Sequence, residues 1–296
     1  MSSLYSRLLE QLAPEHQNTA QTAIAAGLPA KRLVRIVPAK TLSISVSANE
    51  CKQNCAHCNG HYLKGMTPLN RMSEVDFSNY ESVLISGGAF SNGEVAIGSQ
   101  RENLLKLPQH LKLNLHPGFQ PPSNIEFLKQ RDPVVSFDLP SSNRVIAEIF
   151  KLPYRVEDYQ SLYLEYSAQF NTVPHVNIGL DSEECLTEYQ VIDFLCGFSP
   201  KQLVFIMFRP TPGTQLAFRQ PARIEQAIKV LAYAKVKLAC PIKIGCMRPS
   251  AEYRRNFDIL AWLSGCENFV QPDRTLLNIL NDFNIPVIEK NECCAI

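Results

Sequence analysis

Residues 41–58 read TLSISVSANECKQNCAHC, an alternating apolar and polar run followed by three cysteines. The run at 41–47 has the two-residue period of a β-strand. Cys51, Cys55 and Cys58 follow it at C-x3-C-x2-C spacing on one short loop. Three thiolates in this arrangement can hold three irons of a cubane and leave the fourth iron without a protein ligand. The stretch therefore predicts an iron–sulfur centre directly after a strand.

Two other interpretations of the cysteine trio stay open on spacing alone. Structural zinc requires a fourth ligand, which His57 or His61 could supply, but the paired C-x-x-C or C-x-x-H pattern of zinc fingers is missing. Reduced thiols without a metal are the second alternative, although three thiols on one loop have little value for packing.

The composition bounds the class of protein. The 296 residues are 45% hydrophobic and 19% charged, which is typical of a globular chain with a full core. A net charge of +1 lacks the basic excess of a nucleic-acid binder. The sequence shows no apolar run of membrane-spanning length and no signal-peptide pattern. We therefore expect a cytoplasmic protein without a nucleic-acid or membrane partner.

The ten cysteines point to metal chemistry. Disulfide frameworks are typical of short secreted chains, whereas a longer chain without an export signal more often uses reduced thiols at metal sites. This use of cysteine agrees with a reducing compartment.

Short β-branched runs alternate with amphipathic segments from residue 41 onward. The expected strands are 41–47, 82–86, 112–116, 133–139, 175–180, 203–208, 242–246 and 268–270. The expected helices include 157–169, 182–195, 222–237, 251–263 and 274–282. Eight strands, each followed by a mostly helical segment, predict parallel strands closed into a complete or nearly complete (β/α)8 barrel of the TIM type. A doubly wound open sheet is the alternative.

Three regions are expected along the chain. Residues 1–40 are interpreted as an N-terminal helical extension, because 2–12 and 18–26 carry apolar positions at helical spacing. The barrel occupies 41–284. A tail at 285–296 carries two adjacent cysteines.

A barrel places its chemistry where strands end and loops begin. Gly87 and Gly88 follow the strand at 82–86, and paired glycines let a backbone approach a ligand closely. Asp138 ends an apolar run and needs hydrogen-bond donors, and His116 ends the strand before it. A plain turn and a structural histidine are the alternative interpretations.

With these motifs in order, the sequence resembles the radical S-adenosylmethionine (SAM) superfamily. The resemblance implies that Cys51, Cys55 and Cys58 bind a [4Fe-4S] cluster whose open iron is chelated by the amino and carboxylate groups of SAM. One electron then cleaves the sulfonium and gives a 5′-deoxyadenosyl radical that takes hydrogen from carbon. The chain departs from the family at His57, where an aromatic residue is common, and at Ala89, which replaces an acidic residue.

The resemblance also implies roles for residues after later strands. The glycine pair would contact the SAM amino group, a polar residue would meet the ribose hydroxyls, an apolar residue and a glycine would lie against adenine, and an arginine would pair with a carboxylate. The cofactor-binding residues so assigned are Gly87, Gly88, Asp138, Ile178, Gly179 and Arg248.

An auxiliary iron–sulfur cluster is a further expectation. Cys246 follows the strand at 242–246, and Cys293 and Cys294 stand in the terminal Glu-Cys-Cys. These three cysteines are candidate ligands if the tail folds back over the barrel mouth. The cysteines expected to be structural are Cys185, Cys196, Cys240 and Cys266.

Within the superfamily the chain looks most like the group of biotin synthase, lipoyl synthase and the hydrogenase maturase. His-Tyr-Leu-Lys-Gly-Met after the trio, Gly-Cys-Met-Arg-Pro and the terminal Glu-Cys-Cys are most similar to a subunit of the two-component lipoyl synthase. This likeness implies sulfur insertion into an octanoyl group on a lipoyl-carrier protein, with a second radical SAM subunit and an electron donor such as ferredoxin or flavodoxin as partners. It departs from single-chain lipoyl synthase because no cysteine precedes Cys51.

Two alternatives to sulfur insertion stay open. One is another biotin synthase-like or maturase-like radical reaction on a small molecule. The other is a non-enzymatic metal-binding or assembly partner.

Overall fold

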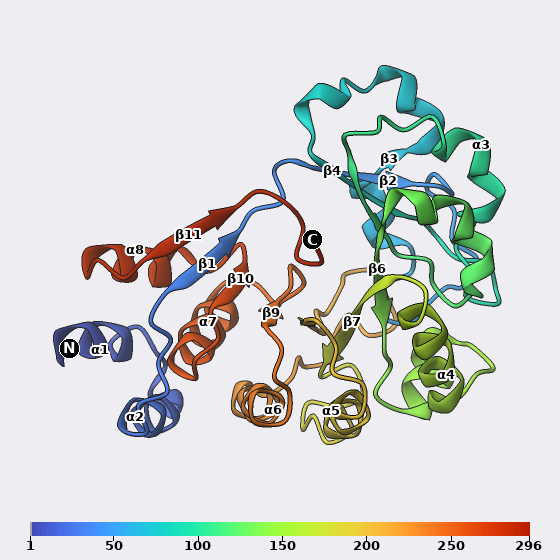
Figure 1. The fold of residues 1–296 in the computed structure, drawn as a ribbon. Coiled ribbons are helices and arrows are strands. Elements are labelled where there is room, and N and C mark those ends of the chain that lie inside the picture. The colour runs from blue at the N-terminus through green and yellow to red at the C-terminus, as the bar shows by residue number, and fades with distance from the viewer. Residues whose placement is uncertain (1) are drawn as a thin grey trace. The chain divides into compact units, whose positions relative to one another are not determined.

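The computed structural model describes residues 2–296, an α/β protein whose helices and strands are shown in Figure 1. The chain divides into two compact units. The first unit comprises the N-terminal segment up to Val37, Asn177–Arg209 and Gln220–Lys290. The second unit comprises Pro38–Val176, Pro210–Arg219 and Asn291–Ile296. No helix among residues 2–296 is both long enough and apolar enough to span a membrane.

The second unit is built on parallel strands in the order β7-β6-β5-β4-β2-β3. Leu42 and Ile44 on one strand and Val83 and Ile85 on the next are buried, which explains why these alternating runs pair. The strands are β2 (Thr41–Ser45), β3 (Thr67–Pro68), β4 (Ser82–Ser86), β5 (Lys112–Leu115), β6 (Val134–Asp138) and β7 (Asn171–Ile178).

The helices of the second unit are mostly short turns. The α-helices are α3 (Arg101–Leu104) and α4 (Val156–Ser167). The 3-10 helices are η2 (His61–Gly65), η3 (Leu69–Glu74), η4 (Phe77–Asn79), η5 (Gly98–Gln100) and η6 (Pro122–Arg131), and η7 (Val145–Phe150) is a π-helix.

The strands of the first unit lie in the order β11-β1-β10-β9-β8, and neighbouring strands in this order are parallel. Its helices pack in succession, α5 on α6, α6 on α7 and α7 on α8 (Figure 1). The strands are β1 (Leu33–Ile36), β8 (Leu203–Met207), β9 (Ile242–Ile244), β10 (Asn268–Val270) and β11 (Val287–Lys290). The helices are α1 (Ser2–Leu9), η1 (Pro14–His16), α2 (Gln17–Ala25), α5 (Glu188–Cys196), α6 (Ile224–Lys237), α7 (Glu252–Leu263) and α8 (Arg274–Asp282).

The α/β class and all eight expected strands are confirmed within a few residues. The helical prediction for residues 1–40 is confirmed for α1 and α2 and is wrong for β1. Leu33 and Ile36 in β1 are buried, and the strand pairs with β10 on one side and β11 on the other. β11 begins inside the predicted tail. Closure into a complete (β/α)8 barrel and the division at residues 40 and 284 stay predictions.

A buried ion pair joins elements of the first unit. Arg248 follows β9 and its Nε lies 3.0 Å from Oδ1 of Asp258 on α7, with both side chains fully buried. Arg248 also donates to the carbonyls of Val270 and Gly245, and Asp258 accepts from the Asp273 N–H at 2.9 Å. Burial raises the pKa of Asp258 and the Arg248 guanidinium opposes that rise. The pair thus links the loop after β9 to α7, β10 and the start of α8.

We expect Asp258→Asn to lower the free energy of unfolding by about 3–5 kcal/mol, because the guanidinium of Arg248 would stay buried without a counter-charge. Urea unfolding followed by circular dichroism measures the change. Arg71→Met is the control, since the Arg71–Glu74 pair is exposed and its loss should leave the unfolding curve nearly unchanged. Equal effects of the two substitutions would contradict the structural role of the buried pair.

Candidate functional site

The cysteine loop follows β2 and is tightly wound. The N–H groups of Cys58 and Asn59 both donate to the carbonyl of Cys55, at 3.3 and 3.0 Å. Asn54 and Asn59 adopt left-handed backbone conformations, which asparagine tolerates better than most residues. Cys51, Cys55 and Cys58 are free thiols, each partly exposed. The structure thus brings the trio together on one loop, and its role in binding metal stays a prediction.

Without a metal, the thiols of Cys55 and Cys58 resist ionisation. Burial raises the pKa of Cys55 to about 12, with contributions from the neighbouring Cys58 and Cys51. Burial also raises the pKa of Cys58. Thiolate is the form that binds metal, so a metal cluster would replace the protons and offset the repulsion between the sulfurs. The donor set therefore fits an iron–sulfur cluster better than three free thiolates.

His57, between the second and third cysteines, has a buried ring nitrogen that bears on ligand binding at this loop. Its Nδ1 is buried and has no hydrogen-bond partner among residues 2–296. Burial lowers the pKa of His57 to about 4, so the imidazole is neutral. Buried polar atoms in folded proteins nearly always have a hydrogen-bond partner, and a group bound at this loop would supply one for Nδ1 of His57.

Structural zinc stays an alternative interpretation of the cysteine trio. A structural zinc ion gathers four ligands around one centre. Within residues 2–296, no group of three or more His, Cys, Asp or Glu side chains is arranged around a single ion position. A cubane needs only one thiolate for each iron and so does not require such convergence.

The turn after β4 is pressed against the cysteine loop. A Cβ added at Gly88 would lie 1.9 Å from the Glu50 carbonyl oxygen and 2.7 Å from Cα of Cys51. The Gly88 N–H donates to Ser47 Oγ at 2.7 Å, and the Lys52 N–H donates to the Ala89 carbonyl at 2.8 Å. Only glycine fits at position 88, because the obstructing atoms include backbone.

Gly87 is also tightly packed, with Ser47 Oγ 3.1 Å from the position that a Cβ would occupy. The expected juxtaposition of the glycine pair and the trio is thus present in the second unit. That the pair contacts SAM stays a prediction.

Two further segments cover the cysteine loop, and the sequence analysis predicted neither contact. The end of the π-helix η7 accepts hydrogen bonds from it: Ala56 N–H to Ile149 O at 2.8 Å and Gln53 Nε2 to Phe150 O at 3.1 Å. The segment Pro210–Arg219 packs on it as well, since Leu216 N–H donates to the Ala56 carbonyl at 3.1 Å. Paired backbone groups on both sides hold the loop rigidly.

A polar group lies at the carboxyl ends of β5, β6 and β7. His116 Nε2 is 3.3 Å from Oδ2 of Asp138, and the His116 and His175 rings meet edge to face with centroids 6.2 Å apart. The strand register places Asp138 directly opposite His175. About a third of the His116 side chain and 43% of the Asp138 side chain are exposed, so the pair is open to a ligand.

The charges of this group favour an ionised carboxylate. Burial acts to raise the pKa of Asp138, but His116, His175 and His57 together bring it below its ordinary value. Burial acts to lower the pKa of His116, and the Asp138 carboxylate reverses this and raises it. The buried Tyr159 feels both Asp138 and Cys55, and its pKa is raised mainly by burial. The carboxylate thus lies within electrostatic reach of the cysteine loop.

The remaining residues predicted to bind the cofactor belong to the first unit, and they form hydrogen bonds or ion pairs with other residues of that unit. The Ile178 carbonyl accepts from Phe208 N–H at 2.9 Å, and the Gly179 N–H donates to Glu188 Oε1 at 2.7 Å. Arg248 is occupied by Asp258 and several carbonyls. Cys246 is exposed just after β9. Their roles toward SAM or a second cluster stay predictions.

The C-terminal tail is ordered, but not where the sequence placed it. The Lys40 N–H donates to the Asn291 carbonyl at 3.1 Å, and Lys112 Nζ pairs with Glu292 at 2.6 Å. Lys40 precedes β2 and Lys112 opens β5, so in the second unit the tail lies at the amino ends of the strands. The expectation that it folds over the mouth is therefore wrong. Asn114 Nδ2 donates to Cys293 Sγ at 3.1 Å, so the sulfur lies beside a buried side chain of β5.

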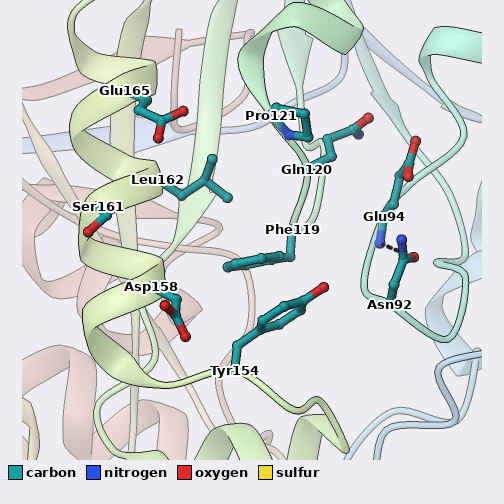
Figure 2. A pocket seen from close by; sticks show the side chains of 10 residues that line it. All are labelled: Asn92, Glu94, Phe119, Gln120, Pro121, Tyr154, Asp158, Ser161, Leu162 and Glu165. Carbon is teal, nitrogen blue, oxygen red and sulfur yellow. Dashed lines mark hydrogen bonds between the residues drawn. The ribbon is translucent and has the colours of Figure 1, made fainter.

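A surface pocket of about 480 Å³ lies elsewhere in the second unit (Figure 2). Its wall includes Phe119 and Tyr154, which stack with centroids 3.8 Å apart. Phe119 also contacts Tyr159, which in turn contacts Phe137 next to Asp138. None of the cysteines, His116 or Asp138 lines the pocket. Its aromatic wall is therefore connected to the strand that carries Asp138 through the rings of Tyr159 and Phe137.

Gly88→Ala should displace the cysteine loop, because the new methyl group would overlap the Glu50 carbonyl. We expect the affinity for iron after anaerobic reconstitution to fall about tenfold or more, as for other changes just outside a metal's ligands. Iron analysis against added iron and sulfide measures this. Gly65→Ala is the matched control, since nothing lies within 4 Å of its Cβ position. Unchanged iron binding in Gly88→Ala would show that the close approach has no role in the site.

Comparison with known proteins identifies the fold. No protein-family model and no curated protein sequence matches the chain. The structure is similar to that of methylornithine synthase, a radical SAM enzyme, with a TM-score of 0.58 and 11% identity, covering 97% of this chain and 93% of that one. An HMG-CoA lyase from Acinetobacter baumannii is more distant, with a TM-score of 0.45 and 10% identity over 88% and 87% of the two chains. At such identity the likeness shows the fold alone.

Proposed function

We propose that this chain is a radical SAM enzyme in which Cys51, Cys55 and Cys58 hold a [4Fe-4S] cluster with one iron open to SAM. The observation that supports this best is the three-thiol loop at the carboxyl end of β2, packed against Gly88 at the carboxyl end of β4. The similarity to the fold of methylornithine synthase supports the same class.

The chemistry supplied by the bound cofactors is one-electron cleavage of SAM to a 5′-deoxyadenosyl radical. The chain's own residues bind and orient. The glycine turn presents main-chain groups beside the loop without a side chain between them. Asp138, kept ionised by neighbouring histidines, is suited to accept hydrogen bonds from ribose hydroxyls. The segments at Phe150 and Leu216 cover the loop and help to exclude water.

For the substrate we propose sulfur insertion into an octanoyl group on a lipoyl-carrier protein. The Gly-Cys-Met-Arg-Pro motif and the terminal Glu-Cys-Cys support this choice. Cys246, Cys293 and Cys294 are the ligands proposed for an auxiliary cluster that donates sulfur, which requires the tail to leave its position at the amino ends of β2 and β5. A second radical SAM subunit and a ferredoxin or flavodoxin are the proposed protein partners.

A radical reaction on a small molecule is the second candidate. The observation that favours it is the similarity in fold to methylornithine synthase, whose name describes a small amino acid as product. In this case the cysteines of the tail would have no part in the reaction.

Anaerobically reconstituted protein should contain at least about four irons per chain. It should form 5′-deoxyadenosine from SAM and dithionite. Cys55→Ala should lose most of that iron and all of the product, because an iron of the cubane loses its ligand. Cys196→Ala is the control, since this thiol interacts with the Lys237 carbonyl on the helical side of the first unit. Bound iron without 5′-deoxyadenosine in the unaltered protein would instead indicate a metal-binding or assembly partner.

The proposed substrate predicts a mass gain of sulfur, with loss of hydrogen, on an octanoylated carrier domain incubated with the reconstituted protein, SAM and reductant. Mass spectrometry of the carrier measures it, in the presence and absence of a second radical SAM subunit. The auxiliary cluster would raise the iron content to about eight per chain, and Cys293→Ala with Cys294→Ala should lower it by about four. An unmodified carrier under all these conditions would exclude sulfur insertion and favour a small-molecule substrate.

A further inference from the structure

His116 has no role in the function proposed so far, yet its position is tightly fixed. Its backbone N–H donates to the Ile85 carbonyl at 2.9 Å, and its carbonyl accepts from Ser86 Oγ at 3.3 Å. Both main-chain groups of His116 are therefore held by β4. The next turn is also constrained, since a Cβ at Gly118 would lie 2.3 Å from the Gly93 carbonyl oxygen. These contacts fix the backbone of His116 at the carboxyl end of β5.

The ring of His116 is oriented by its neighbours as well. His175 lies against it edge to face, and His175 Nδ1 lies 3.1 Å from the Val173 carbonyl. Nε2 of His116 faces Oδ2 of Asp138 at 3.3 Å. Because 43% of the Asp138 side chain is exposed, the carboxylate is also accessible to a hydrogen-bond donor on a ligand. The arrangement thus fixes one oxygen and leaves its neighbour ready to accept a hydrogen bond.

We propose that His116 is a positioning residue for SAM, which holds Oδ2 of Asp138 so that Oδ1 accepts a hydrogen bond from a ribose hydroxyl. This inference rests on the proposed function, because the ligand it names is SAM. The carboxylate is acceptor-only when ionised, and a cationic or neutral imidazole can donate from Nε2 to the oxygen it faces. A fixed acceptor costs less ordering on binding than a mobile carboxylate, so its effect is on ligand affinity.

The other groups around the pair agree with this arrangement. The titratable side chains that influence Asp138 are His116, His175 and His57, and the Tyr159 hydroxyl lies within reach as well. His116 lowers the pKa of Asp138 most, followed by His175 and His57. His116 forms an ion pair with Asp138, with Nε2 3.3 Å from Oδ2.

The first measurement reads the pair without SAM, in the full chain. The ring proton signals of His116, assigned with His116→Gln, should titrate with a pKa above the ordinary value of 6.5. In Asp138→Asn the carboxylate is gone and burial alone acts on the ring, so the pKa of His116 should fall below 6.5. An equal pKa for His116 in both proteins would overturn the inference and leave the proposed function untouched.

The second measurement reads SAM binding by equilibrium dialysis with cluster-loaded, unreduced protein. His116→Ala should weaken SAM binding about tenfold, and His116→Gln, which can still donate to Asp138, should restore part of it. A SAM analogue that lacks the ribose hydroxyl proposed to donate to Asp138 should bind His116→Ala and the unaltered protein with equal affinity. His110→Ala, which removes an exposed histidine before β5, is the control.

The outcomes separate the two proposals. Equal affinity of SAM for His116→Ala and the unaltered protein would overturn the positioning role while SAM binding itself stands. A uniform loss for SAM and its deoxy analogues would indicate a structural effect and overturn the role as well. If the cluster-loaded, unaltered protein does not bind SAM at all, the proposed function fails, and the inference fails with it.

Discussion

The close approach of two backbones is the constraint on which the site depends. The turn after β4 meets the start of the cysteine loop with no room for a side chain at Gly88, and the Ser47 hydroxyl and the Ala89 carbonyl tie the two segments together. Because β2 and β4 are neighbouring parallel strands, their carboxyl ends lie at one edge of the sheet. A loop anchored at that edge keeps its three thiols together before any metal arrives.

The electrostatics of the second unit follow from this packing. Burial makes the thiols of Cys55 and Cys58 reluctant to ionise, so a metal that binds them must displace their protons. At the ends of the next strands, histidines keep Asp138 ionised although burial opposes it. The site therefore combines thiols that await a cation cluster with a carboxylate suited to neutral hydroxyls. Both features agree with the proposed binding of SAM.

Local patterns predicted the strands and the cysteine loop well. The two-residue period located β2 and β4, and the spacing of the cysteines located the loop, because both signals are written in adjacent residues. β1 was missed for the opposite reason. The three apolar residues Leu33, Val34 and Ile36 look the same in a strand and in a helical turn, and the partners β10 and β11 that decide between them lie more than 200 residues away.

The other differences also come from long-range partners. The sequence suggested Arg248 as a ligand-binding cation, but Asp258 on the following helix buries it in an ion pair. The tail lies at the amino ends of the strands because Lys112 and Asn114 on β5 bind Glu292 and Cys293. The pairing of His116 with Asp138 depends on the register between strands, which one sequence does not contain.

The open iron is the central claim, and electron–nuclear double resonance of the reduced, reconstituted protein tests it most directly. With SAM labelled with ¹⁵N at its amino group and ¹⁷O at its carboxylate, the account predicts that both labels couple to the cluster spin. A [4Fe-4S] signal without either coupling, at SAM concentrations that saturate binding, would mean that all four irons have protein ligands or that SAM binds elsewhere. Either result would contradict the account.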